Sequence, residues 1–230
     1  MDTPDELRLV STLLALPGIA HGFSTRLDVH GHRHAFLEAV GVAGFDLALP
    51  RQVHGAAVVT VHGPREADCP ADAVATTERL LSLGVVTADC VPILLADAEA
   101  PAIAAVHAGW RGTVARVVLR AVEALVALGA RPERLRAAIG PHIGPECYEV
   151  GGEVLAAFRA VWPEAGLWFG ADGRHLDLAA VNRDELLAAG LAPAHIELVG
   201  PCSRCDARMA SYRREGTSRA RNLAVIALTP

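Results

Sequence analysis

Residues 85–112 limit the possible folds of this 230-residue chain more than any other stretch. They hold two short β-branched and aliphatic runs, and runs of this kind form buried strands. Each run carries a residue able to bind a soft or borderline metal, Cys90 in the first and His107 in the second. Glycines and then an apolar-periodic segment follow, which predicts a helix over about 113–128. Because open α/β sheets place their sites at strand ends that lead into helices, Cys90 and His107 are the first functional candidates.

Composition and charge argue against two large classes of partner. Aromatic residues make up only 4% of the chain, so it offers no stacking platform for single-stranded nucleic acid, and its net charge of −5 disfavours a phosphate backbone. No apolar run reaches membrane-spanning length, because Asp, Glu or Arg interrupts each one. We therefore expect no nucleic-acid partner and no membrane partner. We expect a monomer or a weak homo-oligomer.

The start of the chain and its cysteines indicate a reducing compartment. Met-Asp-Thr-Pro-Asp-Glu-Leu-Arg is acidic and lacks the basic-then-apolar pattern of a secretory signal. The five cysteines are an odd number and too sparse for a disulfide scaffold. A cytoplasmic protein with some cysteines free for metal or catalysis fits these features best.

Predicted strands and helices alternate irregularly along the chain. Between 68 and 86 we expect a turn, a short helix and then the strand that leads to Cys90. The other expected elements are helices at 33–40, 151–161 and 177–189, the last with Asp177 as its N-cap, and strands at 56–63, 135–139, 196–199 and 223–228. With no linker or repeat between them, residues 1–230 are predicted to form a single α/β (α+β) domain, with a mixed sheet between helical layers.

His54 joins Cys90 and His107 as a third candidate ligand. It stands beside Gly55 just before a predicted strand, where a lone histidine is more often structural. The three residues are 36 and then 17 positions apart, so spacing alone is weak evidence, but each is expected at a strand edge beside Gly or Pro. Two imidazoles and one thiolate suit zinc, and three protein ligands leave a fourth position for water or substrate, as in catalytic zinc sites.

Two other chemistries use the same residues. Cys90 and His107 could be a nucleophile and its base, as in thiol hydrolases. Copper also accepts a Cys-His-His set, but a blue-copper site needs an axial Met, and Met1 and Met209 are the only methionines. The ligand inventory therefore favours zinc, with copper as the alternative.

Asp89 precedes Cys90 directly, which makes it a candidate for catalysis. It could move protons or orient a neighbouring imidazole. A structural cap or turn carboxylate is the alternative.

The remaining chemistry-bearing residues have plainer interpretations. His30, His32 and His34 alternate as metal-binding residues of a strand would, but their polar flanks favour a solvated loop. Cys202 and Cys205 have Cys-x-x-Cys spacing, yet one pair does not complete a four-cysteine zinc site, so we expect structural cysteines.

Five further residues also have plain interpretations. Cys69 and Cys147 lack partners of their own in the sequence. Arg213 and Arg214 are expected in a solvated basic turn rather than a phosphate site. Trp110 is expected to form a packed wall.

Six motifs together resemble the laccase-domain family, also called the multicopper polyphenol oxidoreductase or peptidoglycan editing factor family. The ordered Ala-Asp-Cys and His-Ala-Gly-Trp-Arg-Gly pair is the most specific part, and the resemblance covers nearly the whole chain. The motifs are Gln52-Val-His54-Gly55, Thr87-Ala-Asp89-Cys90-Val-Pro92-Ile, His107-Ala-Gly-Trp110-Arg111-Gly112-Thr113, Ile139-Gly140-Pro141, Tyr148-Glu-Val and Ser211-Tyr-Arg-Arg214.

This resemblance implies a three-layer α/β/α fold with a mixed sheet and a zinc enzyme acting on purine nucleosides. The implied activities are phosphorolysis of adenosine, inosine, guanosine and methylthioadenosine, with phosphate as co-substrate, and deamination of adenosine. The family's metal ligands carry over onto His54, Cys90 and His107. We expect Asp89, Cys90 and His107 to carry the chemistry, and Arg26 and Arg111 to hold the anion or the ribose.

The chain departs from the family pattern in two places. Arg26 is followed by Leu-Asp-Val-His-Gly-His-Arg-His instead of a Gly-rich loop containing Asn, and Met209-Ala210 replaces the usual aromatics. Two alternative functions stay open beside the first one. They are a copper-dependent polyphenol oxidoreductase and a hydrolase that edits a peptidoglycan precursor.

Overall fold

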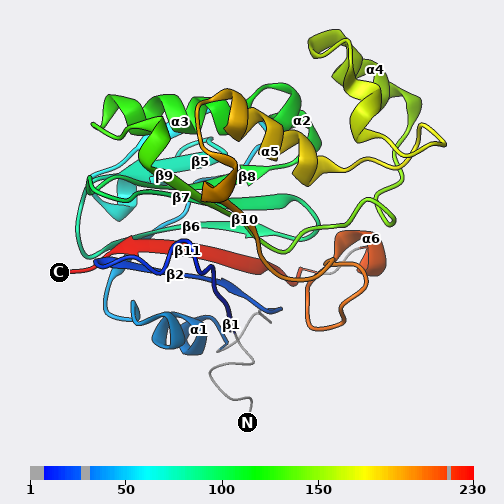
Figure 1. The fold of residues 1–230 in the computed structure, drawn as a ribbon. Helices are drawn as coiled ribbons and strands as arrows, with labels where there is room; N and C mark the ends of the chain where they lie inside the picture. The colour runs from blue at the N-terminus through cyan, green and yellow to red at the C-terminus, as the bar shows by residue number, and fades with distance from the viewer. Residues whose placement is uncertain (1–7, 27–31, 217–218) are drawn as a thin grey trace.

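The fold is built on two stacked β-sheets (Figure 1). The computed structural model describes residues 8–26, 32–216 and 219–230, whose strands form a five-stranded and a six-stranded sheet. The five-stranded sheet has the order β1 (Arg8–Leu9), β2 (Ile19–Ser24), β11 (Asn222–Leu228), β6 (Leu81–Thr87), β3 (Asp46–Ala48). The six-stranded sheet has the order β10 (Ile196–Leu198), β9 (Leu135–Ile139), β7 (Val91–Asp97), β8 (Ile103–Ala108), β5 (Ala73–Thr76), β4 (Val58–Thr60). Both are mixed, because the β3–β6, β4–β5 and β9–β10 pairs are parallel and the other pairs antiparallel.

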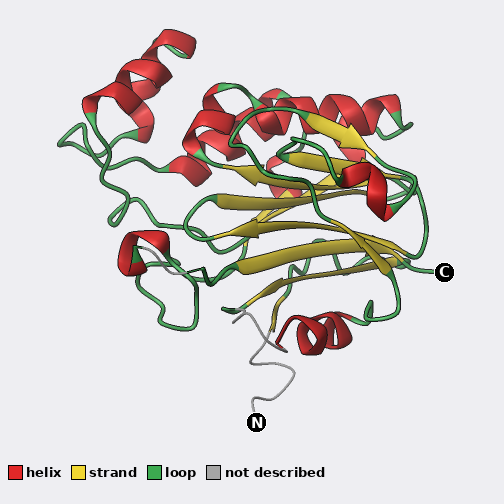
Figure 2. Cartoon of the chain, turned by 180° about the vertical axis from the view of Figure 1, so that it is seen from behind, coloured by secondary structure: helices red, strands yellow, loops and turns green. Residues whose placement is uncertain are grey.

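Helices cover the outer face of each sheet, as the view from behind also shows (Figure 2). The six-stranded sheet carries α3 (Val117–Ala127) and α5 (Leu178–Ala188), and the five-stranded sheet carries α1 (His32–Val40). The other helices are α2 (Trp110–Val114), α4 (Gly152–Val161) and α6 (Tyr212–Glu215), with single turns of 3-10 helix at Pro64–Ala67, Pro132–Arg134, Ala165–Trp168 and Pro193–His195. None of the helices in the described part of the chain is long and apolar enough to cross a membrane.

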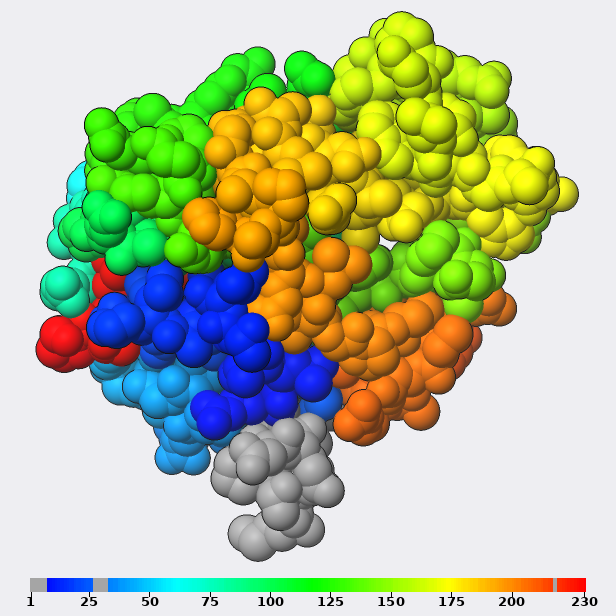
Figure 3. Space-filling model, in the orientation of Figure 1, coloured from blue at the N-terminus to red at the C-terminus, as the bar shows by residue number. Residues whose placement is uncertain are grey.

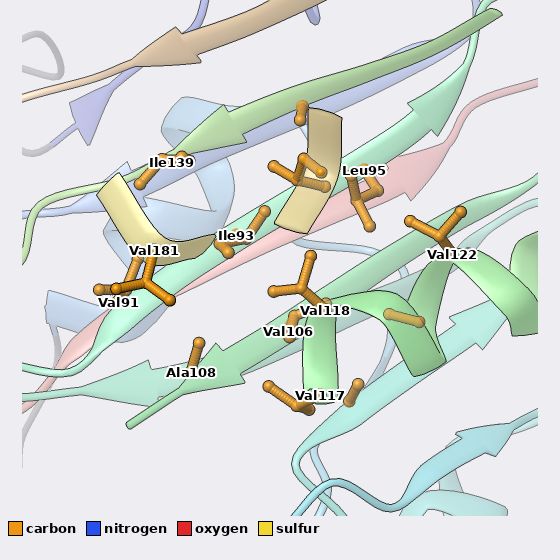
Figure 4. Close-up of a cluster of buried hydrophobic side chains, with 14 of the residues drawn as sticks. Val91, Ile93, Leu95, Val106, Ala108, Val117, Val118, Val122, Ile139 and Val181 are labelled. Atoms are coloured by element: carbon orange, nitrogen blue, oxygen red, sulfur yellow. The ribbon is translucent and has the colours of Figure 1, made fainter. Parts of the chain in front are cut away.

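The alternation of side chains along β7 shows how the layers are held. Val91, Ile93 and Leu95 face the helical layer and belong to one core with side chains of α3 and α5 (Figure 4). Leu94 and Ala96 enter the core between the two sheets. Successive residues of a strand point to opposite faces, so a strand covered on both sides must be apolar throughout. Every residue of β7 is buried, which explains why the sequence run is continuous rather than alternating.

The predicted class of α and β elements with mixed strand pairing is confirmed. The expected single sheet between helical layers is replaced by two sheets, so the layer order is α/β/β/α instead of three layers. A second core that includes Phe23, Leu83 and Leu94 fills the space between the sheets. A strand that is apolar on both faces gives no sign of whether its second face meets a helix or another sheet.

Two local predictions are wrong, and others are confirmed. The short helix expected between 68 and 86 is the strand β5, whose Ala-Val-Ala-Thr pairs with both β4 and β8. The helix expected over 113–128 is broken at Arg116, whose φ of 63° ends α2 and begins α3. The predicted N-cap of α5 is confirmed, because the Asp177 carboxylate accepts the backbone N–H of Ala180 at 2.9 Å. The predicted strands at 135–139, 196–199 and 223–228 correspond to β9, β10 and β11.

The turn after β6 carries the chain from one sheet to the other. β6 ends at Thr87 in the five-stranded sheet, and β7 begins at Val91 in the six-stranded sheet. Asp89 and Cys90 therefore stand in the link between the sheets, with Asp89 at a φ of 89°. β7 and β8 are antiparallel, with Pro92 opposite His107, so the end of β8 lies beside the same turn.

Candidate metal centre

The structure brings His54, Cys90 and His107 together from three separate segments. Their ligand atoms all lie within 4.8 Å of one another. Cys90 directly precedes β7, His107 is on β8, and His54 stands in the loop before β4. The rings of His54 and His107 meet edge to face, with centroids 4.8 Å apart. His107 is buried, whereas His54 is exposed, so the cluster opens to solvent on the His54 side.

Gly109 stands between these three side chains. A Cβ on Gly109 would lie 3.0 Å from Cδ2 of His54, 3.1 Å from Sγ of Cys90 and 3.9 Å from Cε1 of His107. The missing side chain therefore keeps open the space that all three groups border. Two imidazoles and a thiol around such a space are a donor set that fits zinc.

Asp72 is a buried residue of this centre that the sequence analysis missed. Its Oδ1 lies 2.8 Å from Nδ1 of His107 and accepts the backbone N–H of His54 at 2.9 Å. Its Oδ2 accepts the backbone N–H of Gly55 at 2.6 Å and of Val53 at 3.2 Å. Because Nδ1 of His107 is engaged, Nε2 is the ring nitrogen left for a metal. One carboxylate thus orients the His107 ring and holds His54 at a φ of 60°.

The charges of the cluster are set by these contacts. Burial alone would raise the pKa of the Cys90 thiol, but hydrogen bonds and charges from His107 and His54 lower that pKa from 9.0 to about 7. Burial alone would lower the pKa of His107, but the hydrogen bonds that its ring donates to Asp72 and Cys90 raise that pKa to about 9. Both shifts favour a thiolate–imidazolium pair over two neutral groups, and binding a metal would release the imidazolium proton.

Gln52 fastens the His54 loop to the end of β6. Its side-chain amide nitrogen donates to the carbonyl of Val86, and its amide oxygen accepts the backbone N–H of Val86, both at 2.8 Å. These two hydrogen bonds satisfy the backbone N–H and carbonyl of Val86, as a neighbouring β-strand would otherwise do. Gln52 opens the Gln52-Val-His54-Gly55 motif, and in the structure it anchors the loop that carries His54 to β6.

A cavity of about 680 Å³ opens beside the cluster. His54, Cys90 and His107 all border it, together with Asp89 from the turn between the sheets. Three aromatic side chains, Trp110, Tyr148 and Tyr212, and two cationic ones, Arg213 and Arg221, form other parts of its wall. Cavities of this size hold drug-sized molecules. Aromatic side chains suit a flat ring system, and cationic ones suit an anionic group bound beside it.

The carboxylate of Asp89 is buried and tightly held. Ser203 donates its hydroxyl to Oδ1 at 2.6 Å, and the backbone N–H of Arg213 donates to Oδ2 at 2.6 Å. The carbonyl of Asp89 accepts the backbone N–H of Ile143 at 3.0 Å. Asp89 therefore links the turn between the sheets to two loops of the cavity wall. Within the described residues, no hydrogen bond joins this carboxylate to His54 or His107.

The two predicted substrate-binding arginines are not among the residues that line the cavity. Arg111 lies over the ring of Trp110, with 4.2 Å between its Cζ and the ring centroid, so it flanks the cavity wall. Arg26 makes an ion pair with Glu215 at 2.8 Å. Trp110 is half-buried and packs against the core, as the packed-wall interpretation expects.

Other predicted features are placed away from the centre. Residue 30 and the side chain of residue 32 lie outside the described residues, and His34 lies on α1, 3.3 Å from a Glu38 carboxylate oxygen. Arg214 donates to the backbone carbonyls of Ser203, Arg204 and Asp206, so it holds the loop that carries Ser203.

Residues 21–229 match the family described as multi-copper polyphenol oxidoreductase laccase. The chain belongs to this family. Among laccase-family relatives, the purine nucleoside phosphorylase of Deinococcus radiodurans is 47% identical over 199 residues, which cover 86% of this chain and 76% of the relative. Adenosine deaminase RL5, from an unknown prokaryotic organism, is 40% identical over 180 residues, which cover 73% of this chain and 69% of the relative.

The fold of this laccase-family chain also matches a solved structure. YlmD from Geobacillus stearothermophilus superposes with a TM-score of 0.84 at 27% sequence identity, over 96% of this chain and 94% of that one. The resemblance that the six sequence motifs indicate is therefore confirmed. The family description names a metal-dependent oxidoreductase, while the two curated relatives are named for reactions of purine nucleosides.

Proposed function

We propose that this protein is a zinc-dependent purine nucleoside phosphorylase that also deaminates adenosine. The observation that carries the proposal is the convergence of His54, Cys90 and His107 on the wall of a cavity of about 680 Å³. The names of the two curated relatives support purine nucleosides as the substrate class. Adenosine, inosine, guanosine and methylthioadenosine are the proposed nucleosides, and phosphate is the proposed co-substrate.

His54, Cys90 and His107 would hold the zinc ion. When bound, zinc supplies a Lewis acid at the cavity wall. Asp72 keeps the His107 ring in one orientation and one tautomer, so that Nε2 faces the ligand cluster. This assignment agrees with the donor set and with the open space at Gly109.

The aromatic and cationic walls would bind the nucleoside and phosphate. Trp110, Tyr148 and Tyr212 supply aromatic surface that would contact a purine. Arg213 lines the cavity, and Arg111 flanks it, so both are placed to attract an anion. Arg26 is also a proposed contact for the ribose or the anion. Its ion pair with Glu215 would fix the position of its guanidinium group.

Asp89 is the proposed proton-carrying group. Asp89 borders the cavity next to Cys90, while Ser203 and the backbone of Arg213 hold its carboxylate in one orientation. General acid–base catalysis requires a group within hydrogen-bond reach of the substrate atom that gains or loses a proton. Asp89→Asn should therefore lower kcat more than it raises KM, because it keeps the shape of the side chain and removes its proton exchange.

The direct test is an incubation of zinc-loaded protein with adenosine, with and without phosphate. Phosphorolysis predicts adenine and ribose 1-phosphate only when phosphate is present, and deamination predicts that inosine accumulates in the sample without phosphate. Cys90→Ala, prepared in the same way, is the control for a contaminating enzyme. Absence of all three products from zinc-loaded wild type would contradict the proposal.

The two alternative functions have separate products, so they can be tested on the same preparation. A copper-dependent polyphenol oxidoreductase would consume oxygen with a phenol after copper loading. A peptidoglycan-precursor editing hydrolase would release an amino acid from a nucleotide-linked muramyl peptide. Either result without nucleoside turnover would replace the proposed function.

A further inference from the structure

Three cysteines converge at a second place in the molecule. The ligand atoms of Cys147, Cys202 and Cys205 all lie within 4.8 Å of one another, and the sulfur atoms of Cys147 and Cys205 are 3.3 Å apart. All three cysteines are free. The expectation that Cys147 lacks a partner is therefore wrong, because the fold supplies two partners, Cys202 and Cys205, which stand 55 and 58 residues later in the chain.

Two loops meet at this cluster. The loop before α4 carries Cys147, and the loop after β10 carries the Cys-x-x-Cys pair. An isolated parallel β-bridge between the backbones of His142 and Cys202 joins the loops. The backbone N–H of Ser203 donates to the carbonyl of His142 at 2.8 Å. Figure 3 shows the orange segment around residues 200–210 lying against the green segment that precedes α4.

The backbone around Cys202 favours an anionic sulfur. Gly144 donates its backbone N–H to Sγ of Cys202 at 3.2 Å. The backbone N–H of Cys205 donates to the carbonyl of Cys202 at 3.2 Å, which holds the Cys-x-x-Cys turn in one conformation. N–H groups directed at a thiolate are what a sulfur that stays deprotonated at a metal requires.

We propose that Cys147, Cys202 and Cys205 bind a second zinc ion as thiolates. Zinc–sulfur bonds of about 2.3 Å in a tetrahedron place sulfur atoms roughly 3.8 Å apart, which is within the range that the three ligand atoms span. A disulfide would use two of the sulfurs and leave the third without a role. Thiolates are soft ligands that select zinc over the harder divalent cations magnesium and calcium.

A fourth ligand would reach such an ion from the solvent side of the cluster. Cys205 is exposed, whereas Cys147 and Cys202 are half-buried. The Glu146 carboxylate lies on the same turn: its Oε2 is 3.4 Å, and the Cys202 sulfur 3.6 Å, from the point where a Cβ on Gly144 would be. Water or this carboxylate would complete the four ligands of a structural zinc ion.

The ion would act on the cavity by holding its wall. Tyr148 follows Cys147 and lines the cavity, and Ser203 follows Cys202 and donates to Asp89 at 2.6 Å. A metal that ties the two loops would fix the positions of Tyr148 and of the Asp89 carboxylate. The cysteines would thus be positioning residues, with no contact to the substrate.

The first experiment is metal analysis of purified protein, without any nucleoside. We expect two zinc ions per chain in wild type, one in Cys90→Ala and one in the double variant Cys147→Ser, Cys205→Ser. The variant that combines all three substitutions should bind none. Cys69→Ser is the matched control and should keep two, because Cys69 lies in neither cluster.

The second experiment isolates the cluster in the Cys90→Ala background. Cobalt added to metal-free protein should give the intense sulfur-to-cobalt absorption of a thiolate-rich tetrahedral site, and each cluster cysteine replaced by serine should weaken it. Zinc should raise the melting temperature of Cys90→Ala, because an ion that binds only the folded state stabilises it. Cys205→His should retain zinc, since imidazole also binds it.

These measurements can overturn the proposal whatever the enzyme does with nucleosides. Zinc-free Cys90→Ala that gives no cobalt absorption and no thermal response to zinc would contradict it. A disulfide between two of the three cysteines, found by mass spectrometry of protein purified without reductant, would replace it with a redox pair. Failure of the nucleoside assay would leave the zinc count of the cluster unaffected, so the two proposals fail separately.

Discussion

Asp72 holds His107 at two points, by its carboxylate and by its backbone. Its Oδ1 lies 2.8 Å from Nδ1 of the ring, and its carbonyl accepts the backbone N–H of His107 at 2.7 Å. Asp72 is fully buried, and His107 is 2% exposed, so water does not compete for these bonds. Because the same carboxylate also accepts the N–H of His54, removing its charge should disturb two of the three proposed metal ligands.

We predict that Asp72→Asn lowers the zinc affinity of this site by about 10–100-fold, the usual effect of losing a partner behind a metal-bound histidine. Metal competition with a chromophoric chelator measures the change. Asp97→Asn is the matched control, because Asp97 is also buried and accepts the backbone N–H groups of Glu99, Ala100 and Arg131 at 2.8 Å, but at the far end of β7. Equal zinc affinity in the two variants would show that Asp72 has only a structural role.

Replacing Cys90 by alanine separates a metal ligand from a nucleophile. We expect Cys90→Ala to lose one zinc ion and all turnover, while its melting temperature changes little, since aliphatic burial holds the surrounding strands. Metal analysis, the nucleoside assay and thermal melting of the same sample check this. Full zinc occupancy of Cys90→Ala, in a form without the three-cysteine cluster, would exclude Cys90 as a ligand and support the thiol-nucleophile interpretation.

The titration of Cys90 should be visible in zinc-free protein. Because its pKa is lowered to about 7, we expect the thiolate above that pH and the neutral thiol below it. Zinc affinity should fall as the pH drops through the same range, because protons then compete for the sulfur. The thiolate absorbance of wild type minus that of Cys90→Ala gives the titration curve. His54→Ala should move the midpoint upward, and a wild-type midpoint near 9.0 would contradict the ion pair.

Gly109→Ala should weaken metal binding although it replaces none of the proposed ligands. Its methyl group would lie 3.0 Å from His54 and 3.1 Å from Cys90, closer than ordinary packing allows, and would enter the space that the ligands border. Overpacking of this kind costs about 1–3 kcal/mol of stability. Zinc titration and thermal melting measure both effects. Gly63→Ala is the control, since nothing lies within 4 Å of its added methyl. Unchanged zinc affinity in Gly109→Ala would place the metal elsewhere.

The proposed anion contact of Arg111 can be tested kinetically. Loss of one charged hydrogen bond costs about 1.5 kcal/mol, so Arg111→Ala should raise the KM for phosphate roughly tenfold and change kcat less. Arg213→Ala should be measured beside it, because Arg213 lines the cavity. Arg120→Ala is the control, as Arg120 pairs with Glu123 on the exposed face of α3. A KM that responds to Arg213 alone would remove Arg111 from the site.

The three proposed ligands were within reach of sequence reasoning, and Asp72 was not. Cys90 and His107 stand beside Pro or Gly near predicted strand ends, and these local signals correctly indicate one edge of the fold. Asp72 has the pattern of a turn residue before a short apolar run. Its link to His107 arises only from the pairing of β5 with β8, a register that no local pattern specifies.

The same limit applies to the layers and to the second cysteine cluster. Strands such as β7 are apolar on both faces, so their sequence does not tell a helix from a second sheet as the covering layer. Cys147 and Cys205 are 58 residues apart in the chain. Their contact depends on how the loop before α4 and the loop after β10 are folded against each other. Patterns along the chain predict elements well, whereas pairings between distant loops follow from the completed fold.

The central place of β11 has a consequence for synthesis on the ribosome. β11 pairs with β2 on one side and with β6 on the other, and within the described residues those two strands do not pair with each other. The five-stranded sheet therefore cannot close until residues 222–228 have emerged, although all strands of the six-stranded sheet precede them. Until then the nascent chain exposes the unpaired edges of β2 and β6 and the apolar side chains of the inter-sheet core, which makes this interval the one in which a chaperone has most to protect.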